Sequence, residues 1–200
     1  MRLPRMGFTL GLGIASALVV LLGVRLIDLR AAVEEAQRKV LLPYRGYVLP
    51  TIAATTITGD TITIGAVSDS GARQLILVLT TTCPHCRATL PTWRALVDSA
   101  KRNASSRVAV VGVSLDSLRP TLEYANAHGV DYPVVSLTDW KLGQLLKARM
   151  VPQTLVVDHR GVVLFAHAGR LGNGPALDSV YTALLGPPVR SMPAAGGGGR

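Results

Sequence analysis

The chain contains two cysteines, and they stand three positions apart in the segment Cys83-Pro84-His85-Cys86. Disulfide exchange needs one thiolate that attacks and a second thiol that resolves the resulting mixed disulfide. Two cysteines spaced in this way at the start of a helix meet both needs. A disulfide between them would close almost no loop and add little stability, and a structural disulfide framework would need further pairs. The pair therefore predicts redox chemistry.

The two cysteines are predicted to differ in reactivity. Cys83 is expected at a helix N-terminus, where unpaired N–H groups and the helix dipole favour an anion, so its pKa should lie below the free-thiol value of about 8.5. We assign Cys83 as the attacking nucleophile and Cys86, one turn further in, as the resolving thiol. Pro84 removes a backbone donor that a helix start can spare. A partly protonated His85 would stabilise the reduced form; an exposed His85 without an electrostatic role is the alternative.

Metal and cofactor sites are not expected from the remaining sequence. A zinc site would use a second Cys or His pair at suitable spacing, whereas His128, His159 and His167 are scattered. The sequence shows no phosphate-binding glycine motif. We therefore expect no cofactor other than the redox-active Cys83–Cys86 disulfide.

The charge of the chain is basic, with a formal net charge of +9 from 21 basic and 12 acidic residues. The basic residues are dispersed, and no run of Lys and Arg with interleaved aromatic residues occurs. This pattern favours a solvated basic surface over nucleic-acid binding.

Residues 1–25 are predicted to form an N-terminal transmembrane anchor. Gly7–Val24 is uncharged and apolar, and its length matches the lower end of a membrane span, about 17–25 residues. Arg2 and Arg5 favour a cytoplasmic N-terminus. A cleaved signal peptide is the alternative because Ala15-Ser16-Ala17 resembles a cleavage site, although the apolar run continues past it. The domain that follows is expected outside the cytoplasm, in the periplasm or on the outer face, partly because disulfide chemistry suits that compartment.

Three further regions follow the anchor. Residues 26–46 are predicted to be a juxtamembrane helical linker, since apolar residues recur at three- and four-residue spacing up to Pro43. Residues 47–186 are predicted to form one α/β domain, because strand-like and helix-like segments alternate and so indicate a mostly parallel sheet with an antiparallel edge hairpin. Residues 187–200 are expected to be a disordered Pro/Gly-rich tail.

The expected elements can be given by range. The strands are Thr55–Thr58, Thr61–Ile64, Gln74–Leu79, Arg107–Val113, Tyr132–Ser136, Thr154–Val157 and Val162–Ala168. The helices of the domain are Cys83–Arg102, Leu118–His128, Trp140–Ala148 and Pro175–Leu185.

This arrangement resembles the thioredoxin-like superfamily and, within it, the TlpA/ResA-like membrane-anchored thiol–disulfide oxidoreductases. The resemblance covers roughly Leu49–Leu185. It is carried by the anchor, Ile57-Thr58-Gly59-Asp60, Cys83-Pro84-His85-Cys86-Arg87, Leu90-Pro91, Val151-Pro152-Gln153-Thr154, Val156-Val157-Asp158 and Gly161.

The resemblance implies a thioredoxin-like fold, with a central mixed β-sheet flanked by helices. It implies that Pro152 is cis and packs beside the disulfide, and that Val151 offers its backbone to an extended substrate segment. Thr82, which stands where the family usually has Trp, is assigned with Val151 to substrate binding. The expected partners are protein thiols or disulfides outside the cytoplasm and a membrane electron-transfer partner.

The sequence also departs from the family. Leu77 stands where thioredoxins have a buried Asp, and Thr89 stands where family members often have an acidic residue. No carboxylate is therefore visible near Cys86. The Pro-His dipeptide is similar to that of strong periplasmic oxidants, whereas the anchored scaffold resembles reductants of cytochrome c maturation, so the direction of electron flow stays open.

Two alternative functions remain. Thr80 and Cys83 reproduce the Thr-x-x-Cys spacing of peroxiredoxin-like peroxidases, although Ile76 stands where that family has Pro. A non-enzymatic copper-delivery module is the second alternative, since two thiolates bind Cu(I), with His167 as a further ligand only by analogy.

Overall fold

The computed structural model describes residues 5–67, 71–103 and 107–186, and it leaves out the side chains of residues 5–12 and 38. The chain divides after Leu41 into two units, and each is described by itself. The expected disordered tail, residues 187–200, lies outside the described residues.

The first unit is a single helix, α1 (Arg5–Leu41), which runs through the boundary between the expected anchor and the expected helical linker. The sequence explains this continuity, because no proline occurs between Arg5 and Leu41 and Pro43 follows the helix end. Nowhere in the described part of the chain is a helix both long and apolar enough to span a membrane. Residues 1–4 of the expected anchor, and the side chains of residues 5–12, lie outside that part.

The second unit is built on a mixed sheet, as the sequence predicts. Within the described residues its strand order is β5-β4-β3-β6-β7. The strands are β3 (Arg73–Leu79), β4 (Val108–Ser114), β5 (Val134–Ser136), β6 (Gln153–Asp158) and β7 (Val163–Ala168). Strands β3, β4 and β5 run parallel, and β6 and β7 add the antiparallel edge. All residues of β3 are buried, which accounts for its continuous apolar sequence.

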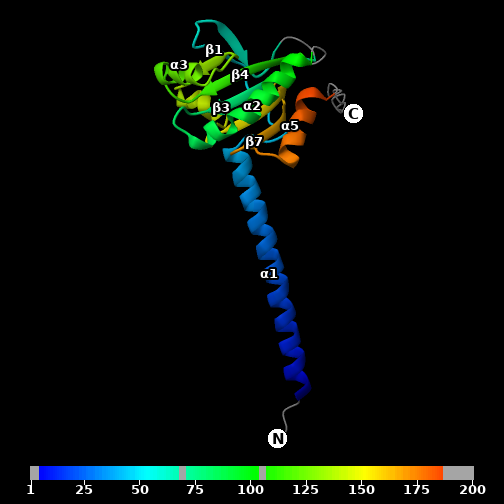
Figure 1. The fold of residues 1–200 in the computed structure, drawn as a ribbon. Coiled ribbons are helices and arrows are strands. Elements are labelled where there is room, and N and C mark those ends of the chain that lie inside the picture. The colour runs from blue at the N-terminus through cyan, green and yellow to red at the C-terminus, as the bar shows by residue number, and fades with distance from the viewer. Residues whose placement is uncertain (1–4, 68–70, 104–106, 187–200) are drawn as a thin grey trace, which may run out of the picture. The chain divides into compact units, whose positions relative to one another are not determined.

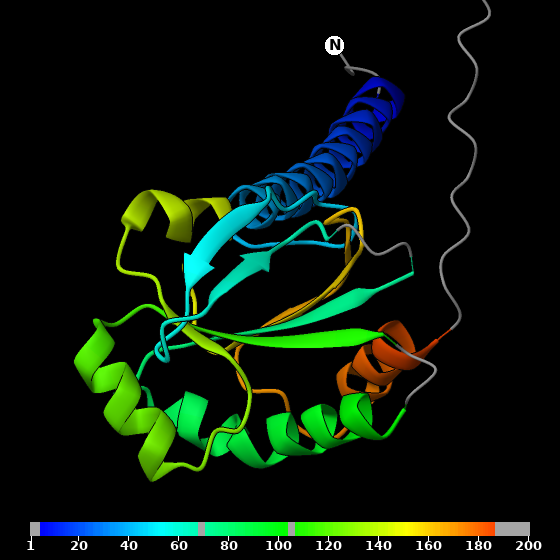
Figure 2. The ribbon, with the colours of Figure 1, turned by 90° about the horizontal axis from the view of Figure 1, so that it is seen from above.

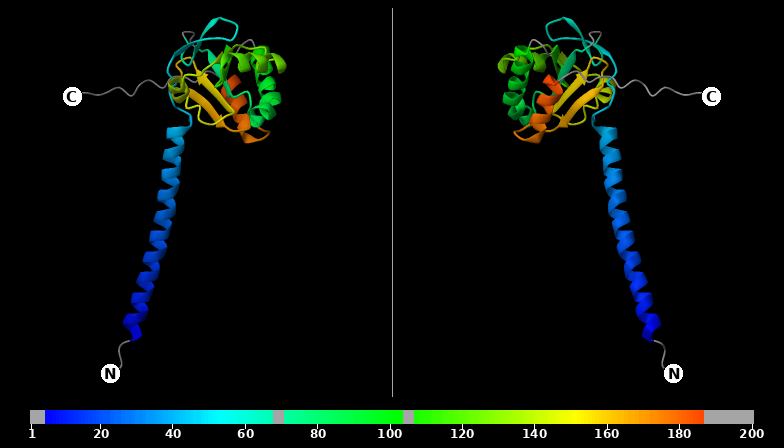
Figure 3. Two further views of the ribbon diagram at one scale, coloured as in Figure 1. Left: turned by 90° about the vertical axis from the view of Figure 1, so that its left-hand side faces the viewer. Right: turned by 90° about the vertical axis from the view of Figure 1, so that its right-hand side faces the viewer.

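Two hydrophobic cores cover the two faces of the sheet. Figure 2 shows the helices 84–102 and 175–185 on one face and the hairpin 52–64 on the other. Leu75, Leu77 and Leu79 of β3 face α2 (Pro84–Arg102) and α5 (Pro175–Leu185), together with one residue of α3 (Leu118–Ala127). Figure 3 shows α2 and α5 on the same face of the sheet. The alternate residues Ile76 and Val78 lie in the second core. This alternation is the period of two that a strand imposes.

The second core is closed by a hairpin and a short helix. The hairpin pairs β1 (Ile52–Thr55) with β2 (Thr61–Ile64). The second strand is confirmed, but the first was predicted at Thr55–Thr58 and instead ends at Thr55. Helix α4 (Trp140–Leu145) begins after its Asp139 cap, as expected, but ends before the predicted Ala148. Lys147 there adopts a positive φ of 50°, which ends the helical geometry.

Trp93 joins helix α2 to strand β6. Its side chain is fully buried, and its indole N–H donates a hydrogen bond of 2.8 Å to the Thr154 hydroxyl. A buried indole keeps such a partner because an unpaired N–H in the core is costly. The helix that carries Cys86, labelled α2 in Figure 1, is thereby fixed against the strand that follows Pro152.

We expect Trp93→Phe to lower the free energy of unfolding by about 2 kcal/mol, because it removes buried apolar volume and leaves the Thr154 hydroxyl without its donor. Trp140→Phe is the matched control, since Trp140 is 65% exposed and its change should stay within about 0.5 kcal/mol. Urea unfolding followed by circular dichroism measures both. Equal losses in the two variants would contradict this role of Trp93.

Candidate active site

Cys83 lies at the N-cap of helix α2, directly after the loop that leaves β3. Its backbone is extended, with φ −76° and ψ 116°, and Pro84 occupies the first turn. The Cys83 Sγ accepts a hydrogen bond of 3.3 Å from the backbone N–H of Cys86. The sulfur therefore caps the helix as an N-cap oxygen would, in the position that favours negative charge.

The two sulfurs differ in access to solvent. Cys83 is partly exposed, whereas Cys86 is completely buried in the core beneath it. An external disulfide can therefore approach Cys83 but not Cys86.

The Val151–Pro152 peptide bond is cis, as the resemblance implies. The Cys83 Sγ lies 4.0 Å from the Val151 carbonyl oxygen, to which its S–H donates. Pro152 is buried, and its own carbonyl accepts a hydrogen bond of 2.7 Å from Gly169 N–H. The structure thus brings Val151, the residue that precedes the cis-proline, to Cys83, although the two are far apart in sequence.

Electrostatics separate the two thiols further. Burial alone would raise the pKa of Cys83, but hydrogen bonds from the Cys86 side chain and from the backbone of Cys86 and His85 outweigh it and lower this pKa. Burial raises the pKa of Cys86 to about 12; a hydrogen bond from the Thr80 backbone opposes the rise, and the charges of Cys83 and Asp116 add to it. Cys83 is thus the thiol that ionises first, which is the order that the attacking and resolving roles require.

The other residues assigned from sequence flank Cys83 along the chain. Thr82, Pro84 and His85 are exposed. The backbone of His85 contributes to the low pKa of Cys83, and its carbonyl accepts a hydrogen bond of 2.8 Å from the Thr89 hydroxyl. Thr89 itself is fully buried, so its hydroxyl is used inside the helix.

Asp116 is the residue that the sequence interpretation missed. Its carboxylate accepts two hydrogen bonds from Thr81, one of 2.5 Å from the backbone N–H and one of 2.8 Å from the hydroxyl. Asp116 follows β4, and Thr81 follows the adjacent parallel strand β3. Because the carboxyl ends of neighbouring parallel strands meet at one sheet edge, a polar residue just after β4 was the available signal.

The structure offers no metal cluster, within the described residues, of three or more His, Cys, Asp or Glu side chains. The ring of His167, the residue considered for a copper site, lies on β7 and contacts the Arg170 carbonyl at 3.2 Å. The two cysteines remain the candidate ligands for a soft metal ion.

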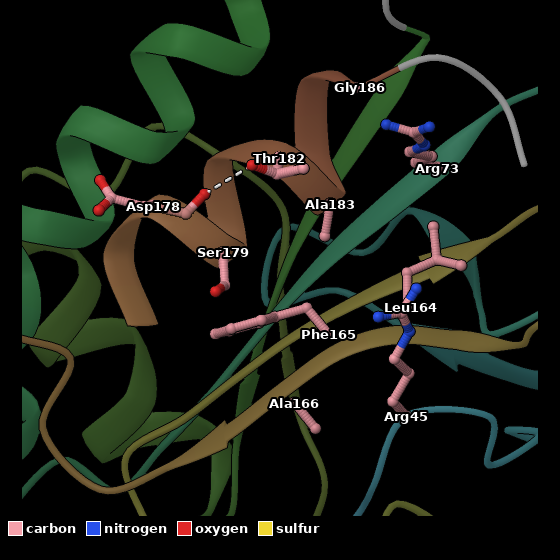
Figure 4. A pocket seen from close by; sticks show the side chains of 10 residues that line it. All are labelled: Arg45, Arg73, Leu164, Phe165, Ala166, Asp178, Ser179, Thr182, Ala183 and Gly186. Atoms are coloured by element: carbon pink, nitrogen blue, oxygen red, sulfur yellow. Dashed lines mark hydrogen bonds between the residues drawn. The ribbon is translucent and has the colours of Figure 1, made fainter. Parts of the chain in front are cut away.

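A separate cavity of about 600 Å³ lies between β7 and α5 (Figure 4). Arg45, Arg73 and Phe165 are among the residues that line it. Arg73 is buried, which lowers its pKa, while the charge of Asp158 opposes that shift. Arg73 begins β3 and Cys83 follows its other end, a distance of about 20 Å along the strand. The cavity is therefore not part of the cysteine site.

This sheet, with a paired-cysteine helix start beside a cis-proline, defines a thioredoxin-like α/β protein. Residues 46–166, more than half of the chain, match the model of the AhpC/TSA family, and the chain belongs to that family. No curated protein matches the sequence.

Solved structures with the same fold include two that are named thiol-disulfide oxidoreductases. StoA from Bacillus subtilis is 18% identical, with a TM-score of 0.54 over 66% of this chain and 98% of that chain. The thioredoxin domain of a thiol-disulfide oxidoreductase from Bacteroides vulgatus is 18% identical, with a TM-score of 0.56 over 71% and 99%. A thiol-disulfide oxidoreductase from Bacteroides fragilis is 19% identical, with a TM-score of 0.55 over 70% and 100%. At these identities the likeness establishes the fold.

We expect the alkylation of Cys83 by iodoacetamide to have a pH midpoint below the free-thiol value of about 8.5. Cys86→Ala removes the side-chain hydrogen bond that lowers the Cys83 pKa, so the midpoint should rise. Cys86→Ser keeps a donor and should stay near wild type. Mass spectrometry of the alkylated protein over a pH series measures this, and an unchanged midpoint in Cys86→Ala would contradict it.

The same ionisation links stability to pH. Folding lowers the pKa of Cys83, so its thiolate stabilises the folded, reduced protein above the pKa of the unfolded thiol. This contribution is lost as the pH falls through the folded value.

Proposed function

We propose that the chain is a thiol–disulfide oxidoreductase that exchanges disulfides with protein thiols through Cys83 and Cys86. The observation that carries the proposal is that the two thiols differ in solvent access and in pKa. Cys83 is accessible, caps a helix and has a lowered pKa, whereas Cys86 is fully buried and has a raised pKa. The reaction uses the two sulfurs and needs no further cofactor.

The reaction proceeds in two displacements. The Cys83 thiolate attacks one sulfur of a client disulfide, and the other client sulfur leaves as a thiolate that takes a proton from water. Cys86 then gives up its proton, and its thiolate attacks the Cys83 Sγ. The second client sulfur leaves with the bonding electron pair and takes up a proton, so the client gains two electrons and the protein holds a Cys83–Cys86 disulfide. The reverse sequence oxidises a client dithiol.

The client lies against Val151 in this proposal. An extended segment of the client pairs with the Val151 backbone. Pro152 packs beside the two sulfurs, and the exposed Thr82 contacts the client segment. The 4.0 Å separation between the Cys83 Sγ and the Val151 carbonyl supports this arrangement. An extended backbone gains main-chain hydrogen bonds without needing a particular side chain, so the mode suits protein clients.

We further propose that residues 1–25 anchor the chain in a membrane and hold the domain outside the cytoplasm. The uncharged stretch Gly7–Val24 supports this, and the TlpA/ResA-like proteins that the chain resembles share the arrangement. A membrane electron-transfer partner would then return the cysteine pair to its active redox state.

A thiol peroxidase is the second candidate, because the chain belongs to the AhpC/TSA family and Thr80 stands three residues before Cys83. In that reaction the Cys83 thiolate attacks peroxide and becomes a sulfenic acid, which Cys86 resolves to the disulfide with loss of water. Rapid peroxide consumption by Cys86→Ser protein would favour this candidate over disulfide exchange.

We expect Cys86→Ser protein to accumulate mixed disulfides with clients, since the resolving thiol is absent while Cys83 still attacks. Cys83→Ser is the control, because the remaining Cys86 is buried and should trap nothing. Non-reducing electrophoresis of the purified full chain incubated with a disulfide-bonded protein measures the adducts. Equal amounts of adduct in the two variants would contradict the assignment of Cys83 as the attacking nucleophile.

His85→Ala is expected to lower the reduction potential of the Cys83–Cys86 pair, because in this proposal the imidazole of His85 stabilises the reduced form. Equilibration with glutathione buffers measures the potential of both proteins. The wild-type value also assigns the direction: a value near that of thioredoxin indicates a reductant, and a value near that of DsbA an oxidant. Equal reduction potentials in wild type and His85→Ala would show that the His85 ring does not stabilise the reduced form.

Membrane attachment is tested by fractionation. The full chain should sediment with membranes and resist carbonate extraction, whereas a chain starting at Tyr47 should be released. Recovery of the full chain in the extracted fraction at its original length would contradict the anchor, and recovery in a shortened form would indicate a cleaved signal peptide.

A further inference from the structure

Asp116 is a charged group at the redox site that the mechanism above does not use. Its carboxylate accepts hydrogen bonds from both the N–H and the hydroxyl of Thr81, at 2.5 and 2.8 Å. Its backbone is fixed as well, since the Asp116 carbonyl accepts a hydrogen bond of 2.6 Å from the Ser136 hydroxyl. The residue is half-buried and held from two sides, so its charge has a defined place.

Thr81 belongs to the short segment that joins β3 to the cysteines. Thr80, the residue before it, donates a backbone hydrogen bond to Cys86, and the Thr80 carbonyl accepts one of 3.3 Å from Cys83 N–H. The Asp116 carboxylate therefore binds the same three-residue loop that contacts both cysteines. Burial is the main cause of the raised pKa of Cys86, and the negative charge of Asp116 adds to that rise as the smallest of its causes.

The other ionisable groups around Cys86 differ from Asp116. From helix α3, Tyr124 belongs to the same buried cluster; burial, then the charge of the Cys86 thiolate, raises its pKa to about 12, so it is neutral at physiological pH. On helix α2 the side chains of His85 and Arg87 are exposed. Cys83 ionises as the nucleophile. Among the described residues, Asp116 is the carboxylate whose charge acts on Cys86.

We propose that Asp116 is a positioning residue that holds a fixed negative charge beside the Cys86 thiol, so that Cys86 stays protonated until the mixed disulfide has formed. The inference rests on the proposed disulfide exchange and concerns its second displacement. Positions 77 and 89, where the family places carboxylates, hold Leu77 and Thr89, and both are fully buried. In this chain the charge comes instead from the end of the neighbouring strand.

The charge has a definite kinetic consequence. A negative charge near a thiol disfavours its thiolate. Removing it while keeping the side-chain shape should increase the fraction of Cys86 that is ionised at a given pH. The mixed disulfide should then resolve faster, whereas the first attack by Cys83 should change little.

Single-turnover reaction of the reduced full chain with Ellman's reagent separates the two steps. The first thionitrobenzoate leaves when Cys83 attacks, and the second leaves when Cys86 resolves the mixed disulfide. Since thionitrobenzoate leaves as an anion and needs no proton, the second phase reports the ionisation of Cys86. We expect Asp116→Asn to speed the second phase roughly threefold or more at neutral pH, and to move its rate–pH profile to lower pH by about half a unit.

Two matched variants isolate the charge. Thr81→Val removes the hydroxyl donor to Asp116 but keeps the charge, and its second phase should match wild type. Asp139→Asn removes an equal charge from the exposed cap of α4 and should also match wild type. If Asp116→Asn fails to fold by circular dichroism, Asp116→Ser carries the same expectation.

Three results would overturn the inference. An unchanged second phase in Asp116→Asn would show that the charge does not act on Cys86. A slower phase would make the carboxylate a proton acceptor instead. A Thr81→Val profile equal to that of Asp116→Asn would assign the effect to loop position. Failure of the proposed function is distinguishable, because a second phase that persists in Cys86→Ser protein would contradict disulfide exchange itself.

Discussion

The hydrogen bond from Cys86 N–H to the Cys83 sulfur is the interaction on which the rest of the site depends. It exists because a loop of three residues joins the fully buried strand β3 to the start of helix α2, so the first cysteine caps the helix and the second lies inside the core. The same geometry lowers the pKa of one thiol and raises that of the other.

Much of the fold could be predicted from sequence, because its signals are local. The apolar run of β3, the Asp139 cap and the Pro175 start of α5 each specify a boundary that the structure reproduces. The predicted end of α4 was wrong, because the positive φ of Lys147 depends on its surroundings and not on its residue type. The cis state of Pro152 followed from the resemblance, since the local sequence does not distinguish cis from trans.

The site was only partly predictable for a different reason. Cys83 and Cys86 stand three positions apart at the start of one helix, and this spacing can be read directly from the sequence. Asp116 reaches the site through the pairing of β3 with β4 and is distant in sequence from positions 77 and 89, where the family resemblance would place a carboxylate. Its contact with Thr81 depends on strand register, which becomes visible when the sheet is assembled. Val151 likewise meets Cys83 through the tertiary fold.

The complete burial of Cys86 also bears on how the protein withstands oxidants. The core around Cys86 includes β3 and Trp93, which belong to the most enclosed part of the domain, so exposing the sulfur to solvent requires cooperative opening of that core. Irreversible over-oxidation of a cysteine needs repeated attack by small oxidants at an accessible thiolate. Over-oxidation is thereby confined to Cys83. The buried Cys86 thiol stays reduced and can still react with a sulfenic acid formed on Cys83.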